Sequence, residues 1–219
     1  METDINNNKL LTKTFFWMFL GLLGTALVSA YTYYSGLYIK IVISNSFALL
    51  LITELIVVLL FTFLFKKLPP TMVAILYFVY SFVNGVTFST IFVIYELKSI
   101  VLLFIVSALL FGGLAFYGYK TDKDLSSWSG MLFGTLIAGL LVSIINLFLG
   151  NSLLDIILDW VILFVFFGIT AYDMNKIKAL VLEENLDKSK LHIYAAMELY
   201  LDFINIFLRI LSIFGKRRD

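Results

Sequence analysis

Long apolar stretches separated by short polar breaks dominate the hydrophobic pattern of this chain of 219 residues. A helix needs about 20 mostly apolar residues to cross about 30 Å of hydrocarbon. Seven stretches reach this length: Thr14–Tyr34, Ser46–Phe65, Thr71–Ile94, Ser99–Tyr119, Ser129–Leu149, Trp160–Ile177 and Ile193–Phe214. The pattern therefore predicts an all-α integral membrane protein with seven transmembrane helices, forming a single polytopic domain over residues 1–219.

The composition supports a membrane protein. Hydrophobic residues make up 61% of the chain and charged residues only 14%, with a mean hydropathy of +0.99. A soluble domain of this length could not keep so much apolar surface away from water. The net charge of +1 offers no broad basic field for nucleic acid, and the absence of Cys excludes disulfides and thiolate metal sites. We expect the lipid bilayer as the environment and no cofactor.

The first apolar stretch has two interpretations. Lys13 precedes it, and Val28-Ser29-Ala30 resembles the small-residue cleavage site of a signal peptide. The apolar run is long for a signal core, which favours a membrane span. The sharpest break further along is Pro69-Pro70, because proline cannot continue a helix and restricts the residue before it.

Basic residues gather on one side of the predicted topology, and cytoplasmic loops carry an excess of Lys and Arg. These residues are Lys9, Lys13, Lys66, Lys67, Lys120, Lys123, Lys176, Lys178, Lys188 and Lys190. The opposite side has Lys40, Lys98, Lys216, Arg217 and Arg218. We predict a cytoplasmic N-terminus in a bacterial plasma membrane, with the endoplasmic reticulum membrane as the alternative. The basic tail then lies outside after seven crossings, or inside if the last segment is re-entrant.

Two acidic residues lie in the last two apolar stretches. Asp173 follows the run FVFFGITAY, and Asp202 lies inside the final stretch. Ionisable residues at membrane depth are costly and usually mark a proton or ion pathway. Asp202 lies about 14 Å along its helix from Ile193, and Asp173 reaches a similar depth if the sixth helix continues through Leu180. Two carboxyls that meet titrate as a pair, because both cannot ionise cheaply. Separate pairing of each aspartate with Lys or Arg is the alternative.

The final stretch carries a polar stripe. Glu198, Asp202, Asn205 and Arg209 follow at i, i+4, i+7 and i+11, which is one face of a helix. The stripe is either a structural network, in which Arg209 neutralises Asp202 or Glu198, or an ion-attracting seam. Glu54 in the second stretch is either a third acid of the pathway or a carboxyl kept neutral by burial.

Other polar residues give weaker signals. Ser81, Asn84 and Thr87 share one face of the third stretch, where helix contacts are favoured over pore lining. Asp155 and Asp159 precede the sixth predicted span, and we expect both to be solvated at the outer interface.

The closing string ELYLDFINIFLRILSIFG, together with AYDMNKIK after the sixth stretch, resembles the Bax inhibitor family. This resemblance implies a seven-helix fold with the last helix central in the bundle. It also implies a pH-sensitive calcium leak channel controlled by a pair of aspartates, which correspond here to Asp173 and Asp202. Calcium would be the transported ion, and H⁺ the ligand that is sensed.

The resemblance also implies two further features of the second helix. An acidic residue there is matched by Glu54, and a basic latch near its inner end would fall at Lys66 and Lys67. Lys makes a point-charge contact where Arg makes a bidentate one, so the latch departs from the pattern of the family.

Two other functions compete with the calcium leak. Calcium prefers oxygen ligands, so Asp173, Asp202 and Glu198 are chemically suitable, but a proton-coupled transporter of a small solute or ion would use the same carboxylates. Intramembrane aspartyl proteases match only at Ala171-Tyr172-Asp173, and their proline-containing motif is absent because no proline follows Pro70. We therefore expect no enzymatic activity.

Overall fold

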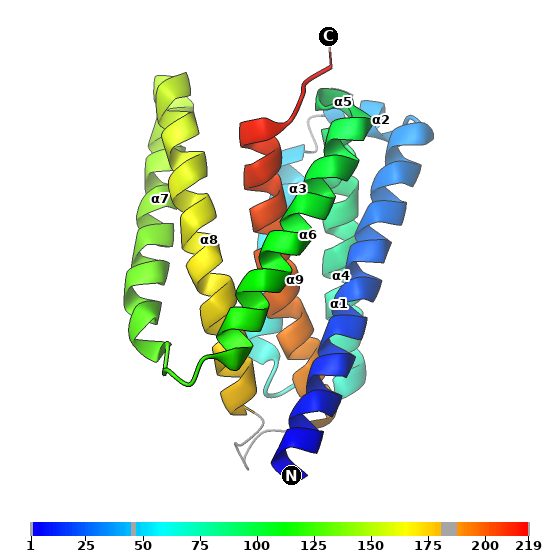
Figure 1. The fold of residues 1–219 in the computed structure, drawn as a ribbon. Coiled ribbons are helices and arrows are strands. Elements are labelled where there is room, and N and C mark those ends of the chain that lie inside the picture. Colours follow the sequence, from blue (N-terminus) through cyan, green and yellow to red (C-terminus); the bar gives the residue numbers. More distant parts are fainter. Residues whose placement is uncertain (1, 45–46, 181–187, 219) are drawn as a thin grey trace. The chain divides into compact units, whose positions relative to one another are not determined.

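The computed structural model describes residues 2–44, 47–180 and 188–218, and its named elements in these ranges are all helices (Figure 1). This confirms the all-α prediction. Two parts of the prediction lie outside the described residues. They are the start of the second predicted span at Ser46 and residues 181–187 of the loop between the sixth and seventh spans. The helices are α1 (Glu2–Tyr34), α2 (Leu37–Ile43), α3 (Phe47–Leu64), α4 (Pro70–Phe88), α5 (Ile91–Ile94), α6 (Leu97–Lys120), η1 (Ser126–Trp128), α7 (Ser129–Leu149), α8 (Ser152–Leu180) and α9 (Lys188–Phe214).

A helix lies at each of the seven predicted spans. Among the residues that the structure describes, five segments are long and apolar enough to cross a membrane: Lys9–Tyr34, Pro70–Ile94, Leu97–Lys120, Ser126–Leu149 and Ser152–Leu180. The apolar part of α3, Leu49–Leu64, is shorter, and α9 has 27 residues but carries the polar stripe. The protein is therefore a helical membrane protein, while the count of seven crossings stays a prediction.

Side-chain hydroxyls divide the third predicted span into α4 and α5. Ser89 donates to the Val86 carbonyl over 2.7 Å, and Thr90 donates to the Thr87 carbonyl over 2.8 Å. Such bonds compete with the backbone hydrogen bonds of a helix. The break between α4 and α5 follows from this competition.

Helix α8 begins eight residues before the predicted start at Trp160. The Asn151 side chain accepts hydrogen bonds from the backbone N–H groups of Leu153 and Leu154, which caps the helix at this earlier point. This start places Asp155 and Asp159 inside the helix, whereas the sequence suggested that they precede it.

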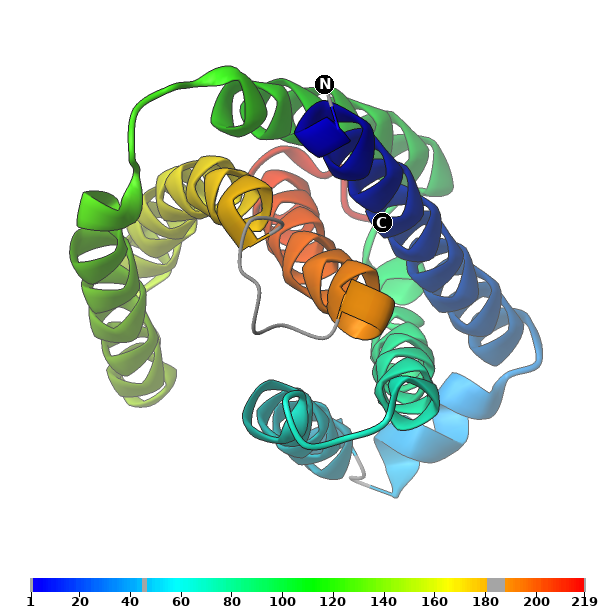
Figure 2. The ribbon, with the colours of Figure 1, turned by 90° about the horizontal axis from the view of Figure 1, so that it is seen from below.

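The chain divides into two compact units, and the first contains residues 1–96, 183–200 and 217–219. Within it, α1 and α3 each lie against α4 (Figures 1 and 2). Gly85 allows the close approach of α1, because a Cβ atom there would lie 2.8 Å from the Thr25 carbonyl oxygen. Small residues at such contacts are typical of helix packing in membranes.

The second unit contains residues 97–182 and 201–216. Within it, α6 and α7 each lie against α8. Gly118 of α6 faces the Ala171 carbonyl of α8 so closely that any Cβ atom would collide with it. The residues of α9 up to Tyr200 belong to the first unit, and those from Leu201 onward belong to the second.

Candidate functional site

The two aspartates predicted to control the pathway are both buried. Asp173 on α8 is 6% exposed and Asp202 on α9 is 3% exposed, and both belong to the second unit. Helix α8 continues through Leu180, which is the condition under which Asp173 was predicted to reach a depth similar to that of Asp202. Burial at membrane depth is the property that marks such carboxyls as functional candidates.

Arg209 of α9 forms an ion pair with Asp159 of α8. Its Nη1 lies 2.6 Å from Asp159 Oδ1, and the Ser212 hydroxyl donates to Asp159 Oδ2 over 2.5 Å. The expectation of a solvated Asp159 is therefore wrong, because the early start of α8 brings this residue inside the helix, where it is buried. Arg209 accordingly neutralises Asp159, which the sequence analysis did not consider as its partner.

Asp155 lies one turn before Asp159 and is exposed, as expected. It accepts a hydrogen bond of 2.6 Å from Asn146 Nδ2 of α7. Gly150, with φ of 62°, ends α7 in the left-handed conformation that glycine tolerates. Asp155 therefore supports the α7–α8 turn.

The carboxyl groups of Glu198 and Glu54 lie in the first unit. Glu198 Oε1 accepts from the Tyr194 hydroxyl, one turn earlier on α9, over 2.5 Å. Glu54 Oε1 of α3 accepts from the Thr87 hydroxyl of α4, also over 2.5 Å. Both side chains are only half-buried. The structure thus places them separately, each beside a hydroxyl donor.

Polar residues of the third predicted span lie at helix contacts. Ser81 and Asn84 are buried and bond to partners on α1 and α9, while Thr87 bonds to Glu54. These bonds join helices within the first unit, which favours the interpretation as contacts over pore lining.

The predicted metal site was sought among the acidic side chains of the described residues. Among the described residues, no group of three His, Cys, Asp or Glu side chains is arranged to hold a metal ion. Two carboxylates with carbonyls and water remain chemically suitable for calcium. A calcium site at Asp173 and Asp202 stays a prediction.

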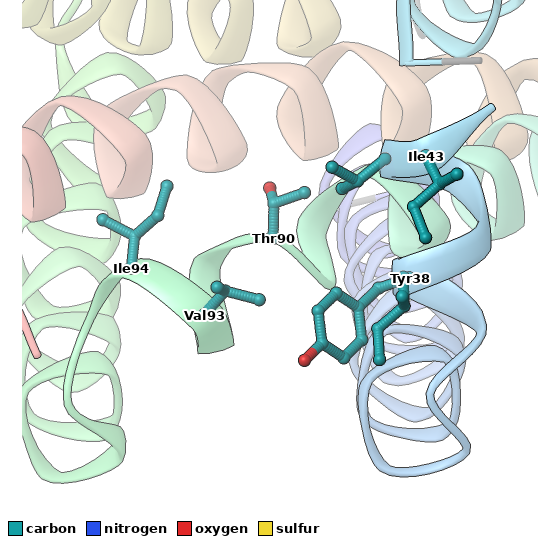
Figure 3. Close-up of a pocket in the computed structure, with 7 residues that line it drawn as sticks. Tyr38, Ile43, Thr90, Val93 and Ile94 are labelled. Atoms are coloured by element: carbon teal, nitrogen blue, oxygen red, sulfur yellow. The ribbon is translucent and has the colours of Figure 1, made fainter. Parts of the chain in front are cut away.

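A separate apolar hollow lies near one end of the first unit. It has a volume of about 350 Å³ and lies between α2 and the α4–α5 region (Figure 3). No Asp or Glu lines it, so it supplies no ligand to the candidate ion pathway. Its lining residues are Tyr38, Ile39, Val42, Ile43, Thr90, Val93 and Ile94.

Comparisons with known proteins settle the family. Residues 7–219 match the family model described as "Inhibitor of apoptosis-promoting Bax1". The chain belongs to the Bax inhibitor family. It is 38% identical over 208 residues to the Escherichia coli inner membrane protein YbhL, covering 92% of this chain and 89% of the relative. It is also 34% identical over 218 residues to a protein of Borreliella burgdorferi, covering 97% and 94% of the two chains.

The structure of this Bax inhibitor family protein also identifies residues that the sequence analysis missed. Lys190 is only 5% exposed, although it was assigned to a cytoplasmic loop. Its Nζ donates to the backbone carbonyls of Lys66 and Leu68 and lies 5.2 Å from the centre of the Phe65 ring. Lys190 thus provides a donor for two backbone carbonyls of the connection between α3 and α4.

This contact bears on the predicted basic latch. The side chains of Lys66 and Lys67 are exposed, and the structure uses the Lys66 backbone carbonyl as an acceptor for Lys190. A latch role for the two side chains stays a prediction. The sequence held no periodic signal for Lys190, because its burial depends on a carbonyl cluster more than 120 residues away in the chain.

Asn175, within the AYDMNKIK string, is a second missed residue. Its Nδ2 donates to the carbonyls of Gly118 and Lys123, and its Oδ1 accepts from the Leu125 amide, each over 3.3 Å. One side chain therefore joins α8 to the end of α6 and to the following loop. The sequence signal that could have identified Asn175 is its position two residues after Asp173.

Proposed function

We propose that this protein is a pH-sensitive calcium leak channel, controlled by Asp173 and Asp202. The observation that carries the proposal is the burial of both carboxyls in one compact unit, on helices that the Asp159–Arg209 ion pair joins. Buried carboxyls of membrane proteins usually mark ion or proton pathways. Membership of the Bax inhibitor family supports the same assignment.

The chemistry of the pair explains a response to pH. Protonation gives a neutral, hydrogen-bonded pair, whereas loss of the shared proton leaves two like charges that repel or take up a cation. Calcium is a hard cation that takes carboxylate and carbonyl oxygen ligands. The sequence assigns Glu198 and Glu54 to the same ion pathway as further carboxyls. No catalytic step is part of this function.

The proposed topology has seven crossings, with the N-terminus in the cytoplasm and the C-terminal tail outside. The tail supports an odd number of crossings. Arg218 bonds to the Ile94 carbonyl and to the Tyr33 hydroxyl, and Tyr33 lies at the end of α1 away from Glu2. The C-terminal tail therefore lies at the opposite end of α1 from the start of this helix. YbhL is an inner membrane protein, which supports a bacterial plasma membrane for this chain.

The decisive experiment is calcium entry into liposomes that hold the purified protein, scanned across neutral pH, from about pH 6 to pH 8, for a change that a coupled carboxyl pair would produce. Wild type is compared with Asp202→Asn and with Asp122→Asn, an exposed loop aspartate of the same unit. We expect pH-dependent flux in wild type and in Asp122→Asn. Asp202→Asn should flatten the pH dependence, because the amide cannot ionise.

An absence of calcium flux at every pH, with folded protein in the liposomes, would contradict the leak channel. Proton uptake driven by a solute gradient in the same liposomes would then support the alternative of a proton-coupled transporter, which uses the same carboxylates.

A further inference from the structure

The apolar hollow of the first unit lies where two candidate membrane spans end. Lys9–Tyr34 and Pro70–Ile94 are both long and apolar enough to cross a membrane. Their ends meet, because the ring centres of Tyr33 and Phe92 lie 5.5 Å apart. Tyr34, the last residue of α1, is exposed, and tyrosine is enriched at the interface between membrane and water. The hollow therefore lies at the depth where acyl chains meet lipid headgroups.

The walls of the hollow are apolar. Tyr38 and Ile43 of α2 form one side, and Thr90 and Val93 of the α4–α5 region form the other (Figure 3). The Thr90 hydroxyl donates to the Thr87 carbonyl over 2.8 Å, so its hydrogen-bonding capacity is used within the helix. The volume of about 350 Å³ is in the range of ligand sites. Such a hollow suits a hydrocarbon chain.

A hydrocarbon chain alone cannot make this hollow selective for one lipid. Lipid tails are as apolar as leucine side chains, so the transfer of a chain from bulk lipid into an apolar groove gains little free energy. Selectivity must come from the headgroup, whose charge either complements the edge of the hollow or does not. The charged side chains around the hollow therefore determine which lipid it prefers.

Arg218 is connected to both walls of the hollow. Its backbone N–H donates to the carbonyl of Ile94, a lining residue of α5, over 2.9 Å. Its guanidinium lies 5.6 Å from the centre of the Tyr33 ring. That ring stacks on Tyr38 of the opposite wall, with ring centres 5.4 Å apart. These contacts fix one positive charge at the edge of the hollow.

Arg218 also keeps donors accessible to a lipid phosphate. Its Nη1 donates to the Tyr33 hydroxyl over 2.5 Å. A guanidinium carries five N–H donors in a planar fork, and this contact uses one of them. Because Arg218 is exposed, a phosphate can approach its other donors. Arginine binds phosphate in this way, often through two parallel hydrogen bonds.

Two more basic side chains lie at this end of the first unit. Lys40 of α2 is exposed and lies three residues before the lining residue Ile43, so the two side chains are neighbours on the helix surface. Arg217, beside Arg218, is exposed as well. Among the described residues of this unit, Glu96 lies at the same end and offsets one of the three positive charges. The edge of the hollow therefore complements an anionic headgroup.

We propose that the hollow binds an acyl chain of an anionic phospholipid, with the phosphate held by Arg218 and attracted by Lys40. This goes beyond the proposed function and does not depend on calcium flux. A zwitterionic lipid offers the same chain, but its headgroup adds a positive charge that the basic edge repels. A second copy of this chain is a poorer occupant, because a two-fold interface would bring the same basic edge against itself.

The test titrates the purified full-length protein with phosphatidylglycerol or phosphatidylcholine, and native mass spectrometry gives the dissociation constant of the first bound lipid. We expect wild type to bind phosphatidylglycerol more tightly. Arg218→Gln and Lys40→Gln should each weaken this binding about fivefold, the effect of one basic residue near anionic lipid, and leave phosphatidylcholine unchanged. Arg218→Lys keeps the charge and should retain most of the preference.

Matched control variants separate the hollow from the rest of the surface. Val93→Trp fills the hollow and should remove the tight first binding of phosphatidylglycerol. Leu59→Trp, on α3, should not, although Leu59 and Val93 are 43% and 42% exposed. Lys13→Gln removes the same charge as Lys40→Gln, but at the opposite end of α1, and should leave the preference unchanged.

Several outcomes would overturn the lipid site. An unchanged preference in both Arg218→Gln and Lys40→Gln, or an equal loss in Lys13→Gln, contradicts the role of the basic edge. Tight binding retained in Val93→Trp, or lost equally in Leu59→Trp, contradicts the assignment to the hollow. Equal binding of the two lipids by wild type would mean that any hydrocarbon chain occupies it. Dimers that Val93→Trp disrupts without a change in lipid binding would assign the hollow to a second copy.

Discussion

At the scale of single residues, the ion pair between Asp159 and Arg209 shows that helix packing determines which carboxylate an arginine binds. Arg209 lies on the same helix face as Glu198 and Asp202, one or more turns away along α9. Its guanidinium instead bonds to a carboxylate on another helix, 50 residues away in the chain. The side chain of Asp159 is only 13% exposed, so the removal of Arg209 would leave a poorly solvated carboxylate.

Asp159→Asn should therefore lower the free energy of unfolding by about 1–3 kcal/mol, the cost of losing a hydrogen bond between charged groups. Denaturation in detergent, followed by tryptophan fluorescence, measures this change. Asp122→Asn is the control, because Asp122 is an exposed loop residue of the same unit and its substitution should have little effect. Adding Arg209→Gln to Asp159→Asn should recover part of the loss, since no uncompensated charge then remains. If Asp159→Asn and Asp122→Asn had the same free energy of unfolding, the stabilising role of the Asp159–Arg209 ion pair would be contradicted.

At the scale of helices, the close packing of two helices depends on the positions of their glycine residues. Gly118 faces the Ala171 backbone, so α6 and α8 approach each other there without an intervening side chain. Gly112 and Gly113 lie on the same helix with nothing near their Cβ positions. The sequence offers all three glycines equally, and only the packing of α6 against α8 distinguishes them.

Gly118→Ala should destabilise the second unit by about 1–3 kcal/mol, because the new methyl group forces the two backbones apart. Gly112→Ala is the matched control, and it should be neutral or stabilising since alanine favours a helix over glycine. Thermal unfolding in the same detergent compares the two. A loss of stability in Gly112→Ala as large as in Gly118→Ala would show that the contact with Ala171 is not the cause.

At the scale of the whole molecule, the tail connects the C-terminus to the end of α1 that lies away from Glu2. Arg218 Nη1 donates to the Tyr33 hydroxyl over 2.5 Å, and the guanidinium lies 5.6 Å from the centre of the Tyr33 ring. Tyr95 and Arg217 add a backbone bridge. The positive charge of Arg218, part of the basic tail that the prediction places outside, thus contacts an aromatic ring and its hydroxyl.

We expect the two ends of the chain to be accessible from opposite sides of the membrane. The protein has no Cys, so Lys13→Cys and Lys216→Cys each give a single label site, at positions that are exposed. A membrane-impermeant maleimide added outside intact cells should label Lys216→Cys, and label Lys13→Cys only after the cells are opened. Labelling of both variants from the same side would contradict seven crossings.

The sequence by itself determined the membrane class, the helical fold, the approximate bounds of the spans and the family. Each of these follows from local hydrophobicity or from a short string such as LYLDFIN, because the bilayer requires long apolar helices whatever their neighbours are. The burial of Asp173 and Asp202 was also foreseeable, since ionisable residues in apolar spans turn away from lipid. The tertiary structure decided the partners: Asp159 for Arg209, the carbonyls between α3 and α4 for Lys190, and Asn84 for Tyr200. These contacts join residues far apart in the chain, so no local pattern encodes them, and helix packing alone determines which polar groups meet.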